Sequence, residues 1–266
     1  MSNVSYKPLI EDMTWSYSRI KTYEDCSYKF FLKYIKEFND EPMFYASYGK
    51  FMHKLIEQFY RGELTKEQML ATFLTDFKSE VKGVRPNDTS VSKYINAGCQ
   101  YLRKFQSFPF NTIDIEKEVF FDVGDYKFTG FIDFIGEHDG KLYIVDHKSR
   151  ELSPRSGRIT PTAKDRLLDD MLKQLYLYSV AIEQEFGCLP EALCFNCFKN
   201  GVFIKEPFDK QKYEETKQWA VDKIRQIENT ESFDPNRNYF SCRWICGLHN
   251  HCPYDIEAQE EARKHR

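Results

Sequence analysis

The chain has 266 residues, a formal net charge of −3, 41% hydrophobic and 30% charged residues. This composition predicts a soluble globular protein with a sizeable core, and it excludes a strongly basic, histone-like binder of nucleic acid. The first residues contain no apolar segment typical of a signal peptide, and no apolar run is long enough to span a bilayer. We therefore expect a cytoplasmic protein with no membrane partner.

Four helices are predicted in the N-terminal part, because apolar residues recur there at helical spacing. They cover residues 16–38, 46–61, 65–82 and 90–106. Ser16 or Ser18 can cap the first of them. Cys26 lies in the middle of this first predicted helix.

The pattern changes at residue 112, where β-branched and aromatic residues begin to dominate. Three predicted strands, 112–123, 126–137 and 141–149, are separated by the turn signals Gly124-Asp125 and Asp139-Gly140. A helix over 164–186, a hairpin over 191–208 turning at Asn200-Gly201 and a helix over 210–229 follow. The order predicts an α/β (α+β) fold with a mixed central sheet flanked by helices and an N-terminal helical insert.

The strongest chemical pattern is the segment "GFIDFIGEHDGKLYIVDHK". Asp146 and Lys148 share one face of a strand, and a hairpin would bring Asp133 beside Asp146. Two carboxylates at one point suit Mg²⁺ or Mn²⁺, and a lysine beside them can orient water or stabilise charge on a phosphate. The apolar residues before each aspartate favour the ends of buried strands over solvated ends.

The basic loop at 149–166 follows this lysine directly. It carries Arg150, Arg155, Arg158, Lys164 and Arg166. The loop is interpreted either as a guide for a phosphate backbone or as a mobile solvated segment.

Eight cysteines in a reducing compartment favour metal ligation or burial over a disulfide framework. Cys99 and Cys188 are predicted to be buried thiols, whereas Cys194 and Cys197 would point to opposite faces of a strand. A group of three lies near the C-terminus: Cys242, Cys246 and Cys252. Zinc bound by these three and by His249 or His251 is one interpretation of that group.

The central set "GFID … IVDHK" resembles motifs II and III of the PD-(D/E)XK nucleases, in their RecB-like branch. "GKFMHKLIEQF" is similar to that branch's helix with a metal-ligating histidine, here His53. "QLYLY" resembles its Q-x-x-x-Y motif on Gln174 and Tyr178. "IEKEVFF" resembles the strand with a glutamate, on Glu118 or alternatively Glu116.

The resemblance implies a single nuclease domain over 1–266 with a restriction-endonuclease-like core at 111–230 and a helical part at 16–110. It implies that Mg²⁺ or Mn²⁺ is held by His53, Asp133, Asp146 and the His147 carbonyl. Lys148 would position water. The residues implied to assist are Glu118, Gln174 and Tyr178.

The segment around Cys26 is similar to the N-terminal cysteine segment of RecB-type nucleases that carry an iron–sulfur cluster, including the AddB nuclease and the CRISPR-adaptation nucleases. The resemblance implies that residues 239–254 pack with Cys26. It also implies a structural [4Fe–4S] cluster held by Cys26, Cys242, Cys246 and Cys252. Ser27 in place of proline and a three-residue first gap depart from that pattern, and zinc remains the alternative.

The implied function is a metal-dependent deoxyribonuclease, an exonuclease on single-stranded or end-processed DNA. Its setting would be DNA repair, recombination or phage DNA metabolism. Because the chain has no P-loop motif, a helicase or recombination protein would be a separate chain. The alternatives are a zinc-stapled nuclease and a non-catalytic DNA-binding protein that retains the fold.

Overall fold

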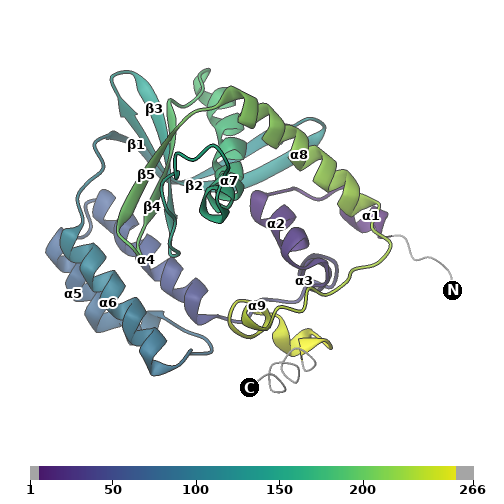
Figure 1. Cartoon of the computed structure of the whole chain (residues 1–266), viewed down its shortest axis with the longest axis horizontal. Coiled ribbons are helices and arrows are strands. Elements are labelled where there is room, and N and C mark those ends of the chain that lie inside the picture. The colour runs from purple at the N-terminus through teal and green to yellow at the C-terminus, as the bar shows by residue number, and fades with distance from the viewer. Residues whose placement is uncertain (1–5, 256–266) are drawn as a thin grey trace.

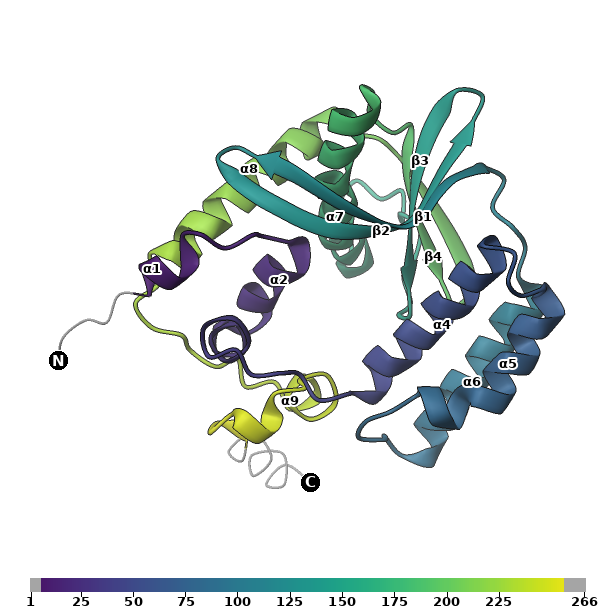
Figure 2. The same ribbon diagram turned by 180° about the vertical axis from the view of Figure 1, so that it is seen from behind.

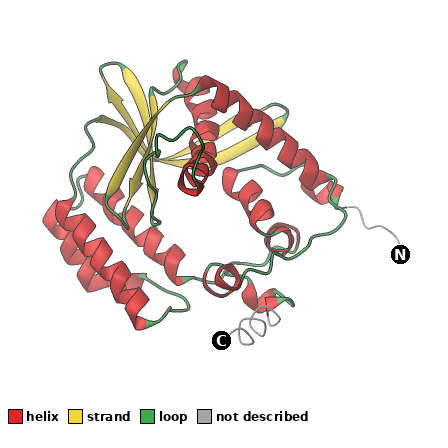
Figure 3. Ribbon diagram, in the orientation of Figure 1, coloured by secondary structure: helices red, strands yellow, loops and turns green. Residues whose placement is uncertain are grey.

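The computed structural model describes residues 6–255. Within these residues the centre of the molecule is a five-stranded sheet in the order β1-β2-β3-β4-β5 (Figures 1 and 3). The strands are β1 (Asn111–Val123), β2 (Tyr126–His138), β3 (Lys141–Lys148), β4 (Ala192–Cys197) and β5 (Val202–Pro207). Only β3 and β4 pair in parallel, so the sheet is mixed as the sequence predicts.

The turns between the strands follow from their residues. Asp139 and Gly140 both have positive φ, 53° and 74°, which is the backbone of the type I′ turn expected between β2 and β3. The β4–β5 turn differs from the prediction. It spans the four residues 198–201 instead of the two residues Asn200-Gly201, because β4 ends at Cys197 while β5 begins at Val202.

Helix α7 (Ala163–Phe186) connects β3 to β4 and packs on one face of the sheet together with α8 (Lys210–Glu228). The parallel pair requires such a crossover connection. Thr162 begins α7 with a capping box, and Gly187, with φ 70°, ends it. The main hydrophobic core lies between this helix layer and the sheet, and it includes Ile132, Ile144 and Leu175.

Three helices form a second layer beside β1 and β4 (Figure 2). They are α4 (Phe44–Tyr60), α5 (Lys66–Glu80) and α6 (Asp88–Lys104), close to the predicted ranges. They enclose a core of their own that includes Phe51, Phe73 and Leu102. The helical part therefore packs as a unit, and α4 contacts β1.

The N-terminal segment corrects the prediction of one helix over 16–38. After the short helix α1 (Lys7–Ile10), the structure has α2 (Tyr17–Asp25), α3 (Ser27–Phe30) and a π-helical turn η1 (Phe31–Ile35). The break is at Cys26, which is extended with φ −164° and ψ 106°. Its Sγ accepts a hydrogen bond from the Lys29 amide, so Cys26 ends one helix and caps the next.

The C-terminal segment contains α9 (Tyr239–Trp244) and the 3₁₀ turn η2 (His249–His251). It lies against the N-terminal helices (Figure 2): the Asp234 carbonyl accepts from the Tyr28 amide, and the Gly247 carbonyl accepts from the Glu41 amide. None of the helices in the described part of the chain is long and apolar enough to cross a membrane.

Two cysteines outside these segments were predicted to be buried. Cys99 is buried, but Cys188 is exposed. The prediction for Cys188 was wrong because α7 ends at Phe186, which leaves that thiol on a surface loop and not in an apolar helix.

Candidate active site

Asp133, Asp146 and Lys148 meet where β2 and β3 run side by side. Phe134 pairs with Val145, so Asp133 and Asp146 occupy the next position of the ladder. The His147 amide donates to Asp133 Oδ2 at 2.6 Å, and Lys148 Nζ lies 2.7 Å from Asp146 Oδ2. The two carboxylates are almost completely buried, at 8% and 3% exposed. A buried acidic pair of this kind needs a cation or a proton beside it.

Helix α4 brings His53 to this pair from the other side. Its Nε2 lies 3.1 Å from the His147 carbonyl oxygen, and its Nδ1 lies 3.6 Å from Asp133 Oδ2. Gly49, one turn earlier, allows the approach, because a Cβ there would lie 3.2 Å from Ser149 Oγ. Glu57, one helical turn after His53, pairs with Arg61.

The glutamate that reaches the site is Glu116, not Glu118. Glu116 Oε1 lies 3.8 Å from His53 Nδ1, whereas Glu118 is exposed and pairs across the sheet with Phe131. The reason is a local irregularity: Glu116 has φ 50°, a left-handed conformation rare in strands. This conformation changes which way the side chain points, and simple alternation along β1 does not anticipate it.

The arrangement fits a divalent cation. His53, Glu116 and Asp133 each offer one ligand atom, and these atoms lie within 4.8 Å of one another. The buried Asp146 Oδ2 accepts no hydrogen bond in the described structure, although it is ion-paired with Lys148. An Nε2–H that donates to the His147 carbonyl would leave His53 Nδ1 as a free ligand. These nitrogen and carboxylate ligands suit Mg²⁺ or Mn²⁺.

The surroundings raise the pKa values of two groups in the site, Asp133 and His53. Burial, reinforced by the charge of Asp146, raises the pKa of Asp133 to about 7. Burial opposes protonation of His53, but the charge of Asp133 and the hydrogen bond to Glu116 prevail and raise its pKa. The site therefore favours bound positive charge, whether a proton or a metal ion.

Lys148 is held from the opposite side by α7. Its Nζ donates to Gln174 Oε1 at 2.8 Å, and Gln174 Nε2 donates to the Tyr178 hydroxyl at 3.1 Å. Gln174 and Tyr178, one helical turn apart, thus form a chain that ends on the lysine. Gly130 makes room for it, because a Cβ there would lie 2.4 Å from the Tyr178 ring.

The side chain of His147 points away from the acidic group and is buried. Its Nδ1 lies 3.1 Å from Asn196 Nδ2, and Asn196 also donates to the Tyr101 hydroxyl at 2.7 Å. Burial holds the pKa of His147 well below its usual range, so the ring is neutral. Sequence reasoning missed Asn196. The signal was a polar residue inside the apolar strand "ALCFNC".

The four cysteines near the chain ends gather at one place. Asn236 links two of them, donating to Cys26 Sγ at 3.4 Å and accepting from Cys242 Sγ at 3.8 Å. Burial raises the pKa of Cys242 to about 11, and the neighbouring charges of Cys246, Asp255, Cys26 and Cys252 add to the shift. The thiols therefore lie close enough to interact electrostatically.

The basic side chains of the loop after β3 differ in their contacts. Arg155 is engaged by Glu206 and Asp169, so it holds the loop to β5 and α7. Arg150, Arg158 and Lys164 are exposed. An open hollow of about 420 Å³ lies beside His53 and Glu116, with Lys50 and Lys54 also on its lining. Glu57 and Glu116 line the same hollow and Lys54 pairs with Glu80, so within the described residues Lys50 is the lining lysine without an ion pair.

A family model described as the PD-(D/E)XK nuclease superfamily matches residues 14–255. One solved structure, from Eubacterium rectale and named as a candidate exonuclease, is 14% identical; the match covers 94% of this chain and 90% of that chain, with a TM-score of 0.48. Another, SSO0001, is 19% identical over 77% of this chain and 96% of that chain, with a TM-score of 0.32. No curated protein matches.

The family match includes both strands that carry the buried carboxylates and the helix that carries His53. The mixed sheet flanked by helices is the restriction-endonuclease-like fold of that family. Two aspartates and a lysine converge where the pairing of β2 with β3 ends, and the family match explains this arrangement: the chain belongs to the PD-(D/E)XK nuclease superfamily.

Proposed function

We propose that this chain is a divalent-metal-dependent deoxyribonuclease of the RecB-like branch, acting from the ends of single-stranded or processed DNA. The observation that carries the proposal is the convergence of Asp133, Asp146 and Lys148 with His53 and Glu116 at one buried point. A protein that only binds DNA has no need for buried carboxylates, because a carboxylate forms no ion pair with a phosphate.

Each group has a defined role in this proposal. Asp133, Asp146 and His53 would hold Mg²⁺ or Mn²⁺. Glu116 takes the role that was predicted for Glu118, and the second lone pair of the His147 carbonyl is available to the metal. When bound there, such an ion would supply Lewis-acid polarisation of the phosphate and a water of lowered pKa. Lys148, oriented by Gln174, stabilises the charge that develops on the phosphate oxygens. The exposed cations Lys50, Arg150 and Arg158 would steer the DNA backbone.

The decisive experiment is digestion of end-labelled single- and double-stranded DNA with Mg²⁺ or Mn²⁺. We expect Lys148→Ala to lower the cleavage rate by about a hundredfold or more. Because the change also removes the ion pair with the buried Asp146, the rates are compared at a temperature at which both proteins are folded. Lys141→Ala is the matched control, because Lys141 is on the same strand but forms an exposed ion pair with Glu191. Equal, negligible cleavage by wild type and Lys148→Ala would refute the nuclease proposal.

We further propose that Cys26, Cys242, Cys246 and Cys252 hold a structural [4Fe–4S] cluster. The cluster would tie the C-terminal segment 239–254 to the helical part 16–110, and both would form one nuclease domain with the core 111–230. In a tetrahedral zinc site the sulfurs lie ~3.8 Å apart, as bonds of ~2.3 Å require. The candidate zinc ligands are the sulfurs of these cysteines and the ring nitrogens of His249 and His251. Within the described residues, no group of three of them has its ligand atoms within 4.8 Å of one another. A cluster bonds each sulfur to a different iron, which tolerates wider spacing.

Anaerobic purification followed by iron, sulfide and zinc analysis separates the two metals. The cluster predicts a brown protein with about four irons per chain. A colourless protein with one zinc per chain would establish the zinc-stapled alternative. A cytoplasmic place in repair, recombination or phage DNA metabolism, with a separate helicase, completes the proposal.

A further inference from the structure

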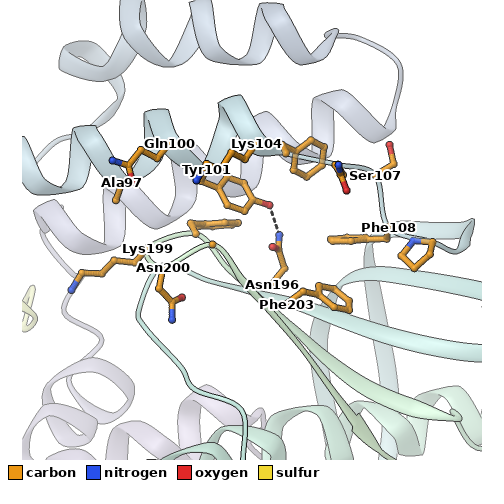
Figure 4. Close-up of a pocket in the computed structure, with 15 residues that line it drawn as sticks. Ala97, Gln100, Tyr101, Lys104, Ser107, Phe108, Asn196, Lys199, Asn200 and Phe203 are labelled. Atoms are coloured by element: carbon orange, nitrogen blue, oxygen red, sulfur yellow. Dashed lines mark hydrogen bonds between the residues drawn. The ribbon is translucent and has the colours of Figure 1, made fainter.

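A cavity of about 460 Å³ lies outside the proposed metal site, between α6 and the β4–β5 hairpin. Figure 4 shows its lining residues, which come from α6, from the segment that follows it and from both strands of the hairpin. The volume is enough for a single nucleotide-sized ligand. None of the functional roles proposed above uses this space.

Aromatic rings form much of the lining. Tyr101 and Phe198 contact each other edge-on with centroids 5.2 Å apart, and Phe108 lies 5.3 Å from Phe203. Asn196 lies between Tyr101 and the Phe108–Phe203 pair (Figure 4). Phe203 is 38% exposed, so one ring remains available for stacking. An exposed aromatic face beside polar groups suits a flat heterocycle.

The floor of the cavity carries a buried polar group with unused capacity. Asn196 is only 4% exposed, and its amide nitrogen faces the Tyr101 hydroxyl and His147 Nδ1. Within residues 6–255 no hydrogen bond reaches the Asn196 side-chain oxygen. The Tyr101 hydroxyl accepts from Asn196 and keeps its own proton to donate. The cavity therefore presents an acceptor and a donor side by side, which matches the edge of a nucleobase.

The charges around the cavity point to an anion. No carboxylate lines it, and Lys104 forms no ion pair within the described part of the chain. Lys199, the other lining cation, pairs with Glu151, and Figure 4 shows it directed away from Asn196. Lys104 is therefore the cation available to a phosphate.

We propose that this cavity binds one nucleotide unit, with the base on Phe203, Asn196 and Tyr101 and its phosphate near Lys104. The unit could be a free mononucleotide or one nucleotide of a DNA strand, and both present the same chemistry. A nucleotide bound in the cavity would act on the active site through two steps of contact. Asn196 contacts the His147 side chain, and the backbone of His147 contacts both Asp133 and His53.

Calorimetric titration of the intact protein in EDTA tests this site without any cleavage. The probes are the four deoxynucleoside 5′-monophosphates, a short single-stranded oligonucleotide and inorganic phosphate. We expect saturable nucleotide binding with a Kd on the order of 0.1 mM, weakened about tenfold by Phe203→Ala and by Lys104→Ala. Phosphate alone would bind at least tenfold more weakly.

Two matched controls fit this design. Arg103→Ala removes the neighbouring cation on the last turn of α6. Phe186→Ala removes from α7 a phenylalanine that is 37% exposed, nearly as exposed as Phe203. Both should bind like wild type. The cleavage-deficient Lys148→Ala should also bind normally, so failure of the nuclease proposal and failure of this one are distinguishable.

The mononucleotides and the oligonucleotide distinguish the source of the bound nucleotide. Binding of mononucleotides that is lost in Phe203→Ala and Lys104→Ala identifies a free nucleotide, and the same losses seen only with the oligonucleotide identify a base of the strand. Either result supports the site. Absence of binding by both probes, binding unaffected by the two substitutions, or phosphate binding as tight as nucleotide binding would overturn it.

Discussion

At the scale of single residues, the site is a set of carboxylates that the protein buries without fully compensating their charge. Lys148 balances part of it, and the raised pKa of Asp133 and of His53 shows how strongly the rest attracts a cation. Such uncompensated burial costs stability and is retained where it serves a function.

The stabilisation by metal should increase with pH. The folded protein holds a proton on Asp133 up to about pH 7, whereas an unfolded aspartate loses it near pH 4. Without metal, the free energy of unfolding therefore falls as pH rises through this window. The raised pKa of His53 acts in the same direction, because its stabilising charge is present at low pH and lost as pH rises through the folded-state pKa.

A divalent cation replaces these protons, so Mn²⁺ should raise the melting temperature by about 3 °C or more at pH 8 and by much less at pH 5.5. Thermal unfolding with EDTA or Mn²⁺ at both pH values measures this. In Asp133→Asn the pH dependence of the metal effect should largely disappear. A metal effect that is larger at pH 5.5 than at pH 8 would contradict the assignment.

The choice between the two glutamates can be tested directly. Glu116→Gln should weaken Mn²⁺ binding and slow cleavage by about tenfold or more, because Glu116 lies beside His53 and Asp133. Glu118→Gln, an identical chemical change two residues away on the exposed surface, should have little effect on either. Manganese titration and cleavage rates measure both variants, and a larger effect at Glu118 would reverse the assignment.

At the scale of elements, the site depends on how α7 and α4 pack on opposite sides of the β2–β3 pair. Helix α7 reaches Lys148 through Gln174, and its approach needs the missing side chain at Gly130. Helix α4 reaches Asp133 through His53. The catalytic geometry is therefore set by two helix–sheet contacts and not by the strands alone.

Gly130→Ala should destabilise the protein by about 1–3 kcal/mol, because the new Cβ would lie 2.4 Å from the Tyr178 ring. Cleavage should also fall, since displacement of Tyr178 moves Gln174 and Lys148. Thermal unfolding and cleavage assays measure the two effects. The neighbouring Thr129→Ala is the control and should change both only slightly. Unchanged stability in Gly130→Ala would show that α7 can shift without cost.

At the scale of the whole molecule, the two ends of the described chain are held together. Hydrogen bonds join Cys26 to Asn236 and Ser27 to Asp234, and the cysteines at both ends gather around them. A cross-link between residues 26 and 242 would close a loop of more than 200 residues, which strongly restricts the unfolded chain.

Cys26→Ser should remove the bound metal and expose the C-terminal segment to proteases. A serine can still cap α3, so the loss would report the sulfur ligand and not the cap. Iron content, melting temperature and limited proteolysis of the purified protein measure this. Cys188→Ser, a change at an exposed thiol outside the group, should match wild type. Full iron content in Cys26→Ser would exclude Cys26 as a ligand.

The sequence by itself determined what depends on neighbours along the chain. Periodicity predicted most helices and all five strands, and Asp133, Asp146 and Lys148 were grouped correctly because a short hairpin joins them. Pairing at such short range is encoded by turn residues and alternation.

Only the tertiary structure decided the features that depend on distant contacts or on one unusual dihedral angle. The left-handed backbone at Glu116 selected the glutamate, and the extended backbone at Cys26 broke a helix that its periodicity favoured. Asn196 met Tyr101 and His147 across elements that lie far apart in the sequence. Local propensity carries no information about such meetings, because packing between elements overrides it.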